Sequence, residues 1–254
     1  MHSFIRNMIV ELVNQSQTQT TYRTPLVGMT AADNPGFARL KELVGPGHLL
    51  PHDLLPEARS VVAFFVPFSE ELIRQHRQAA DITREWAVAY IETNQLISSI
   101  CSTLVEELQQ KGVKAAWQQP THNFDATLIA NWSHKHVAYF CGLGTFGLNQ
   151  MLITAAGCAG RLGSLVVDSE LPSTPVPSRE YCLHRREGKC AVCTRLCPTE
   201  ALRLEGLDKA KCYQQLLKIN DYFADLGLCD VCGKCAVGPC ALAVPGTTKA
   251  SHSK

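Results

Sequence analysis

Cysteines are the residues of this chain whose type and spacing can do chemistry. Nine of the twelve cysteines lie between positions 182 and 240. They are spaced as Cys182-x7-Cys190-x2-Cys193-x3-Cys197-Pro198, then Cys212 alone, then Cys229-x2-Cys232-x2-Cys235-x4-Cys240. A [4Fe–4S] cubane takes four thiolates, and a short C-x2-C turn can present two of them to one cluster. In two-cluster ferredoxins the cysteine of a Cys-Pro pair ligates the other cluster. Nine cysteines therefore fill the eight ligand positions of two [4Fe–4S] clusters and leave one spare.

Two other uses of clustered cysteines compete with this interpretation. A disulfide framework is typical of small secreted chains, whereas this chain has 254 residues and shows no export signal. Zinc sites usually combine two C-x2-C pairs about 15–20 residues apart. The gap from Cys193 to Cys229 is longer, and a zinc site would leave Cys182, Cys197 and Cys212 unexplained. The pattern therefore favours iron–sulfur clusters.

Length and composition set broad limits on the protein. The chain is long enough for one large domain or two modest ones, and its hydrophobic content of 46% is ordinary for a globular protein. The net charge of +1 does not indicate a polyanionic partner. No apolar run reaches the length of a membrane span, and the first residues do not form a signal peptide. Thiols kept free for metal imply a reducing compartment, so we expect a cytoplasmic protein.

Helix and strand patterns are mixed ahead of the cysteines. Residues 60–68 are β-branched and aromatic with little alternation, which predicts a strand buried on both faces. Residues 81–111 form the longest predicted helix, with Asp81 as N-cap, Gly112 after its C-terminus and Cys101 in its apolar stripe. Other predicted helices are 2–13, 37–44, 130–141 and 208–226, and other predicted strands are 113–117, 151–154 and 162–167. Three prolines in residues 170–179 indicate a linker.

A glycine loop lies between these elements. Its residues Gly142, Leu143, Gly144, Thr145, Phe146 and Gly147 match G-x-G-x-x-G, with Asp168 at a suitable distance for a ribose contact. A dinucleotide site, however, needs a strand before the glycines and a helix after them. Here residues 132–141 favour helix and residues from 151 favour strand. A tight turn without a ligand is one alternative. The other, which we favour, is close backbone approach to a different large, flat ligand, because three glycines remove three side chains from one surface.

The stretch at residues 132–149, WSHKHVAYFCGLGTFGLN, resembles the central motif of the epoxyqueuosine reductase superfamily. Residues 152–157 and 161–167 continue that resemblance. Residues 190–202, CAVCTRLCPTEAL, resemble the first ferredoxin motif of the superfamily. Residues 208–212 and 232–240, DKAKC and CGKCAVGPC, resemble its second. The resemblance extends over residues 60–245.

This resemblance implies an α+β fold, with a nitroreductase-like, cobalamin-binding domain followed by a ferredoxin-like module with two [4Fe–4S] clusters. Reductive dehalogenases share this plan. We therefore expect domains at residues 1–172 and 173–245 and a disordered tail at 246–254. Electrons from a low-potential donor of the ferredoxin or flavodoxin type would pass through the clusters to cobalt, which would reduce the substrate. The glycine loop would lie against the corrin ring. A flavin is the alternative cofactor.

The resemblance also implies a ligand assignment. One cluster would be held by Cys182, Cys190, Cys193 and Cys240, and the other by Cys197, Cys212, Cys232 and Cys235. Cys229 would be the spare cysteine. A plain ferredoxin pattern would instead use Cys229, Cys232 and Cys235 together and omit Cys212.

The chain departs from the family pattern at several positions. After Gly-Leu-Gly the family has tryptophan and then Gly-Lys, where this chain has Thr145 to Leu148. The register of the family's general-acid aspartate falls on Leu128, three residues after Asp125. The sequence shows no counterpart of the family's tRNA-binding helical repeats and no basic stripe. We therefore expect a small-molecule substrate and no nucleic-acid partner.

A reduction also needs a proton donor near the substrate. The candidates are Asp125, His134, His136 and Tyr139, which precede the glycine loop. On a helix His136 and Tyr139 would share a face, because they are three residues apart. Each candidate also has a purely structural alternative, as a hydrogen-bond partner or a solvated side chain. Two functions follow: a cobalamin-dependent iron–sulfur reductase, or an electron carrier or activator that serves a partner and has no substrate chemistry of its own.

Overall fold

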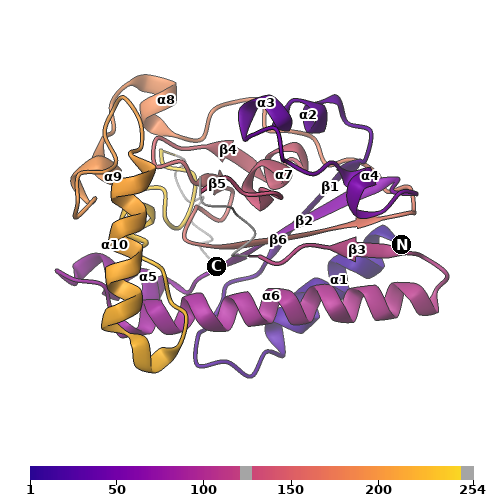
Figure 1. The fold of residues 1–254 in the computed structure, drawn as a ribbon, viewed down its shortest axis with the longest axis horizontal. Coiled ribbons are helices and arrows are strands. Elements are labelled where there is room, and N and C mark those ends of the chain that lie inside the picture. The colour runs from indigo at the N-terminus through magenta and orange to yellow at the C-terminus, as the bar shows by residue number, and fades with distance from the viewer. Residues whose placement is uncertain (121–127, 247–254) are drawn as a thin grey trace, which may run out of the picture.

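A four-stranded antiparallel sheet lies between two layers of helices in the computed structural model, which describes residues 1–120 and 128–246 (Figure 1). The strand order is β1-β2-β6-β3. The strands are β1 at Leu26–Ala31, β2 at Ser60–Pro67, β6 at Gly160–Val167 and β3 at Ala115–Trp117. Every neighbouring pair is antiparallel. The mixed helix-and-sheet class expected from the sequence is confirmed.

The central strand β2 is buried along all eight residues. Val62 and Phe64 contribute to the core on one face of the sheet, whereas Val61 and Phe65 contribute to the core on the other. Successive side chains of a strand point to opposite faces, so covering both faces removes the need for polar residues between the apolar ones. The prediction of a doubly buried strand is correct.

One face of the sheet is covered by α6 at Arg84–Gln110 and α1 at His2–Asn14 (Figure 1). The helix α6 begins later than predicted, because Thr83 and not Asp81 is its N-cap: the Thr83 hydroxyl accepts the Trp86 amide at 3.3 Å. Its end agrees with the prediction. Gly112 has φ +74°, and the Val113 amide closes the helix on the Leu108 carbonyl at 2.9 Å.

The opposite face is covered by α7 at His134–Phe140 and three one-turn helices. These are α2 at Pro35–Ala38, α3 at Leu40–Leu43 and α4 at Pro51–Leu54. The predicted helix 37–44 is thus two short helices that meet at Arg39. The predicted helix 130–141 is shorter than expected, with Ser133 at its N-cap.

A two-stranded hairpin follows α7, formed by β4 at Gly144–Phe146 and β5 at Leu152–Thr154. The glycine loop is therefore a turn that runs into a strand, preceded by a helix and followed by another strand. This is the reverse of the strand–loop–helix order of a dinucleotide fold. Several shorter elements were not predicted, among them β1 and the helix α5 at Glu70–Gln78.

The cysteine segment, residues 173–246, lies along one end of the sheet (Figure 1). Its elements are α8 at Leu183–Glu187, α9 at Val192–Arg195, α10 at Lys209–Tyr222, and the 3-10 turns η1 at Ala224–Leu226 and η2 at Lys234–Ala236. Buried apolar residues of this segment, as far as the structure describes it, pack in clusters shared with the N-terminal part. The predicted tail is described only at Gly246; residues 247–254 lie outside the described part.

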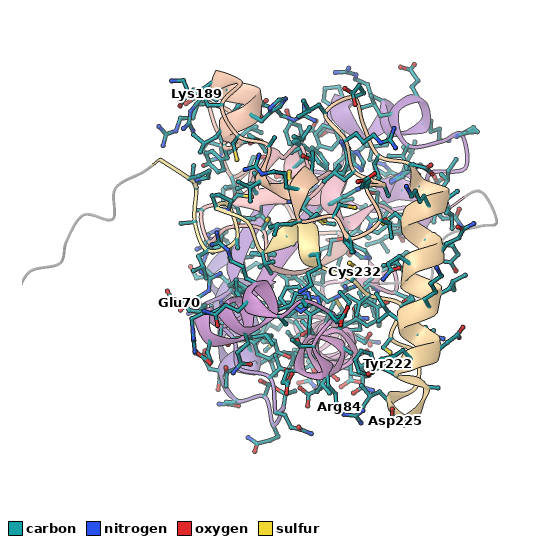
Figure 2. The ribbon with its side chains drawn as sticks, turned by 90° about the vertical axis from the view of Figure 1, so that its left-hand side faces the viewer. Glu70, Arg84, Lys189, Tyr222, Asp225 and Cys232 are labelled. Atoms are coloured by element: carbon teal, nitrogen blue, oxygen red, sulfur yellow. The ribbon has the colours of Figure 1, made fainter. Side chains whose placement is uncertain are left out.

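Specific contacts fasten the cysteine segment to the sheet domain. The Arg23 guanidinium donates to the carbonyls of Phe68, Ala156 and Leu242 at 2.8–2.9 Å. Arg84 of α6 forms an ion pair with Asp225, just after α10, as Figure 2 shows. In the described residues no helix is both long and apolar enough to cross a membrane.

Candidate functional site

Four cysteines from three places line one cavity, and we call them the first cysteine set: Cys182, Cys190, Cys193 and Cys240. Cys182 is the N-cap of α8, Cys193 lies on α9, and Cys240 follows η2, which packs beside α9. This first cavity is small, about 20 Å³, and its other walls are mainly apolar. Burial raises the pKa of Cys193 to about 11, with further contributions from the other three thiolates of the set.

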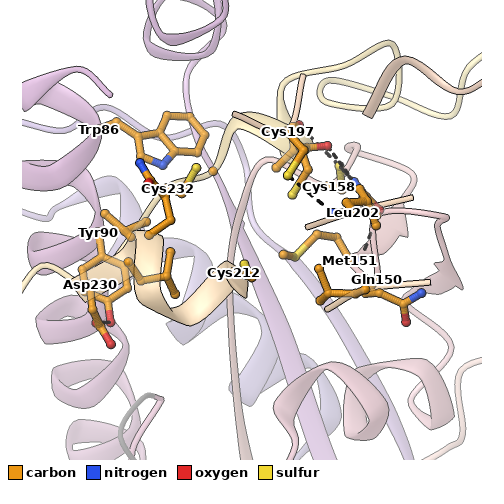
Figure 3. Close-up of a pocket in the computed structure, with 18 of the residues that line it drawn as sticks. Trp86, Tyr90, Gln150, Met151, Cys158, Cys197, Leu202, Cys212, Asp230 and Cys232 are labelled. Atoms are coloured by element: carbon orange, nitrogen blue, oxygen red, sulfur yellow. Dashed lines mark hydrogen bonds between the residues drawn. The ribbon is translucent and has the colours of Figure 1, made fainter. Parts of the chain in front are cut away.

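The second cysteine set, Cys197, Cys212, Cys232 and Cys235, lines a larger cavity of about 280 Å³ (Figure 3). Cys212 lies on α10 and Cys235 on η2. Burial raises the pKa of Cys232 to about 11, and Cys212 and Cys197 add to that effect. Burial also raises the pKa of Cys235, again with Cys232 and Cys212 contributing. The four thiols of this set are therefore electrostatic neighbours, like those of the first.

Cys229 belongs to neither group. Its side chain is fully buried beside Tyr90, Ile219 and Phe223, and its thiol donates to the Phe223 carbonyl at 3.8 Å. Burial raises its pKa, followed by the charges of Asp230 and Asp225, and no cysteine contributes. This arrangement differs from a plain ferredoxin pattern, in which Cys229 would stand with Cys232 and Cys235.

Three cysteines lie outside the 182–240 stretch, and one of them approaches the site. Cys101 is buried in the core beside α6, as predicted, and Cys141 is buried in the core beside α7. The Cys158 sulfur, by contrast, lies 3.7 Å from that of Cys240 and also lines the second cavity. Hydrogen bonding with Cys240 raises the pKa of Cys158, so Cys158 keeps its proton. The sequence analysis gave Cys158 no role, because its spacing belongs to neither cysteine motif.

The donor sets fit iron–sulfur clusters better than single metal ions. Within residues 1–120 and 128–246, no three His, Cys, Asp or Glu side chains converge as the ligands of one ion do. Zinc would need such convergence, with thiolates at about 2.3 Å from one centre. A cubane spreads its four thiolates over four irons, and soft thiolates are the ligands that iron–sulfur clusters take. Each set supplies four of them around its own cavity.

Residues of α5 and α6 hold Cys232, just before η2, and Cys235, within it, in place. A Cβ on Gly233 would lie 2.2 Å from the indole nitrogen of Trp86, so only glycine fits there, at φ +73°. The His76 ring stacks on Trp86, with ring centroids 4.2 Å apart, and its Nε2 hydrogen-bonds the Cys232 carbonyl at 2.8 Å. The Lys234 ammonium donates to the His76 and Ala79 carbonyls, each at 2.7 Å.

The glycine loop does not offer the open surface expected of it. A Cβ on Gly142 would lie 2.7 Å from the Pro175 carbonyl oxygen, and one on Gly144 would lie 2.0 Å from that of Ile153. A Cβ on Gly147 would lie 2.4 Å from the Asn149 side chain. The missing side chains therefore make room for the protein itself and not for a flat ligand. Neither cavity is lined by Gly142, Leu143, Gly144, Thr145, Phe146 or Gly147.

Two of the predicted proton donors are held by other parts of the protein. The His134 ring is buried between the Ser164 hydroxyl at 2.8 Å and the Gln119 carbonyl at 3.0 Å. Burial lowers its pKa to about 4, so it is a neutral structural partner. His136 bonds the Ser133 hydroxyl at 2.7 Å, and burial also lowers its pKa to about 4, with help from Lys135.

His136 and Tyr139 do share a face of α7, since both rings contact Phe146, at 4.7 and 5.8 Å between centroids. Neither residue lines the second cavity. The fourth candidate, Asp125, lies outside the described residues.

Lys135 and Arg161 are cavity residues that the sequence analysis did not single out. Lys135 faces away from its neighbours His134 and His136, and its ammonium donates to the Gln150 carbonyl at 3.2 Å in the second cavity. Arg161 lies over the Tyr90 ring at 4.4 Å, and its Nε is buried without a hydrogen-bond partner. Burial lowers the pKa of each. Neither residue carries a sequence signal of its own, because both reach the cavity only through the fold.

Solved structures described as epoxyqueuosine reductases and as a reductive dehalogenase have a similar fold. The epoxyqueuosine reductase from Bacillus subtilis matches at a TM-score of 0.59 with 18% identity, over 95% of this chain and 66% of its own. An epoxyqueuosine reductase crystallised with a tRNA-Tyr stem loop gives the same values. A reductive dehalogenase whose structure suggested a mechanism for B12-dependent dehalogenation matches at 0.53 with 14% identity, over 83% of this chain and 28% of its own.

These similarities confirm the resemblance drawn from the sequence, at the level of fold. The chain spans about two thirds of the length of the epoxyqueuosine reductases that it matches. No protein-family model and no curated protein sequence matches it.

Proposed function

We propose that this chain is an iron–sulfur oxidoreductase in which each cysteine set holds one [4Fe–4S] cluster. One observation carries the proposal: eight cysteines from scattered positions sort into two sets of four, and each set lines a separate cavity. Cys229 is the ninth, and we assign it to the apolar packing under α10. The similarity in fold to two classes of reductase supports the oxidoreductase activity.

We further propose that a low-potential ferredoxin or flavodoxin supplies the electrons and that a small molecule receives them. The clusters would supply one-electron relays, and a bound corrinoid would supply a strongly reducing cobalt centre. The similarity to a dehalogenase described as B12-dependent supports a corrinoid. The glycine loop does not fit one, because its three glycines face protein atoms. The loop therefore gives no support for a corrin surface, and that role stays a prediction; flavin is the alternative cofactor.

The chain's own residues would bind and orient the substrate in the second cavity. Apolar side chains such as Phe68 and Leu202 exclude water from its walls. The Arg161 guanidinium offers a buried, unpartnered Nε–H that an acceptor on a ligand can satisfy. The Tyr90 hydroxyl donates to the Asp230 carboxylate at 2.5 Å, which orients both groups. Lys135 carries exchangeable protons in the wall of the second cavity, and we add it to the candidate proton donors.

The test is anaerobic purification of the full chain, with iron and sulfide analysis and a visible spectrum. We expect about eight iron atoms per chain and a broad absorption shoulder, as two [4Fe–4S] clusters require. Corrinoid or flavin bands on top of that shoulder would identify the second cofactor. Colourless protein that contains zinc would overturn the proposal.

A second candidate function is an electron carrier or activator without substrate chemistry. The observation that favours it is the filled glycine loop, which removes the expected cofactor surface. In that case the purified protein would show cluster absorption alone and would pass electrons to a partner protein. A tRNA substrate is a separate possibility that comes from the fold. Restoration of queuosine in a reductase-deletion strain would support it, and unchanged queuosine would remove it.

A further inference from the structure

The two cavities differ in charge as well as in size. The first cavity has no charged residue in its walls beyond the cysteines, among those described. The second cavity has two cationic residues, Lys135 and Arg161, and one acidic residue, Asp230. Asp230 already accepts the Tyr90 hydroxyl. Setting the cysteines aside, the walls of the second cavity carry a net positive charge, and the walls of the first carry none.

Lys135 is held where its charge can act on the second cysteine set. It projects from α7 into the cavity, and its ammonium is tied to the Gln150 carbonyl at 3.2 Å. Burial and the charge of Lys209 lower the pKa of Lys135, and a thiolate at Cys235 opposes them, so Lys135 and Cys235 are electrostatic neighbours. Water cannot screen this pair fully, because Cys235 is only partly exposed.

Lys234 is a second buried cation beside the second cysteine set. It is only 5% exposed and lies in sequence between Cys232 and Cys235. Its two 2.7 Å hydrogen bonds to the His76 and Ala79 carbonyls fix the ammonium at the end of α5. A cation held this rigidly acts as a constant charge and not as a solvated one.

This difference in charge leads to an inference that rests on the proposed function. We propose that the charges of Lys135 and Lys234 raise the reduction potential of the cluster at the second cysteine set, so that it is the more easily reduced of the two. Reduction adds one negative charge to a cluster, and nearby cations stabilise that charge. Electrons that enter at the first cysteine set would then move to the second and collect beside the cavity that holds Arg161 and Tyr90. The charges of the cavity walls would thus set the direction of electron transfer between the two clusters.

The experiment is an anaerobic redox titration of the iron-loaded full chain, followed by electron paramagnetic resonance. Wild type should show two reduction steps at separate potentials. Lys135→Met should lower the higher of the two reduction potentials by about 59 mV. For a one-electron step, this shift corresponds to a tenfold smaller ratio of reduced to oxidised cluster at a fixed potential. Lys135→Arg should keep the wild-type value. Lys189→Met, at an exposed lysine near Cys190, should leave both steps unchanged.

The assignment of the two steps is tested separately, so that the idea does not depend on the stability of the lysine variants. Cys212→Ala should remove the higher-potential signal, and Cys190→Ala the lower one. The inference is overturned if Cys212→Ala removes the lower signal, or if Lys135→Met holds both clusters with unchanged potentials. Either result would leave the proposed function intact. Absence of clusters from the wild-type chain would instead refute the proposed function itself.

Discussion

The sheet domain and the cysteine segment are held together in different ways. In the sheet domain, side chains such as Phe64, Ile97 and Leu104 are fully buried in a continuous apolar core. In the cysteine segment the 14-residue helix α10 buries only Ile219. Its apolar residues Leu217 and Tyr222 are 43% and 79% exposed. One part can therefore fold by close packing, whereas under the proposed function the other would be stabilised by metal bound to its thiolates.

The strongest way to break this comparison is to remove one thiolate. We expect Cys193→Ala to lose about half of the iron, because one of two clusters loses a ligand. The cysteine segment should then become sensitive to limited proteolysis while the sheet domain stays resistant, since metal binding there is also folding energy. Cys229→Ala is the matched control in the same segment and should keep its iron. An iron content that stays at the wild-type value in Cys193→Ala would contradict the ligand assignment.

A core truncation tests the other half of the comparison. Leu104→Ala removes a fully buried side chain from the core beside α6. It should lower the free energy of unfolding by about 2–5 kcal/mol, measured by urea titration. The iron content per folded chain should not change. Leu217→Ala, at a 43% exposed position, is the control and should change stability by no more than about 0.5 kcal/mol. Equal effects of the two substitutions on the free energy of unfolding would contradict the burial of Leu104 in the core.

Acid should weaken the sheet domain through His134. Burial lowers its pKa from 6.5 to about 4, so the unfolded chain binds a proton that the folded chain does not. Its stabilising contribution is therefore complete above pH 6.5 and is lost as the pH falls towards 4. The loss should reach about 3 kcal/mol. His134→Gln should flatten the pH dependence of the unfolding free energy by that amount. An unchanged slope in this variant would mean that His134 titrates normally in the fold.

The smallest expected effect concerns the glycine loop, which leads from α7 into the β4–β5 hairpin. Gly144→Ala brings a Cβ to within 2.0 Å of the Ile153 carbonyl oxygen, so the β4–β5 hairpin must shift. We expect a loss of about 1–3 kcal/mol in the free energy of unfolding. Gly47→Ala is a suitable control, because its nearest atom would be 3.9 Å away. If Gly144→Ala were as harmless as the control, the loop would be open enough for a ligand after all.

Much of the architecture could be predicted from local patterns. The strand β2 and the helix α6 carry their own signals, because their apolar residues repeat over many positions. The strand β1 was missed because Gly28 interrupts its short apolar run; the glycine is needed where the Cys141 carbonyl approaches, 2.1 Å from a Cβ placed there.

The candidate site could be predicted less well, because it depends on contacts between distant segments. The nine clustered cysteines were found by spacing alone, whereas Cys158 reaches Cys240 only through folding. The three glycines of the loop suggested a ligand surface, and the structure shows a physical reason for a different use. Three glycines indicate that something comes close to the backbone, but the sequence does not say whether that is a ligand or the carbonyls of Pro175 and Ile153.

The position of Trp86 has a practical consequence. Its indole lines the second cavity, stacks on His76 and lies against Gly233 beside Cys232 (Figure 3). The other two tryptophans, Trp117 and Trp132, pack in the cores on either side of the sheet. An iron-containing chromophore in that cavity would quench the emission of Trp86 most strongly. Tryptophan fluorescence could then follow cluster insertion at the second cysteine set in real time. Trp86→Phe would be the control, because it lacks the emission that the cluster quenches.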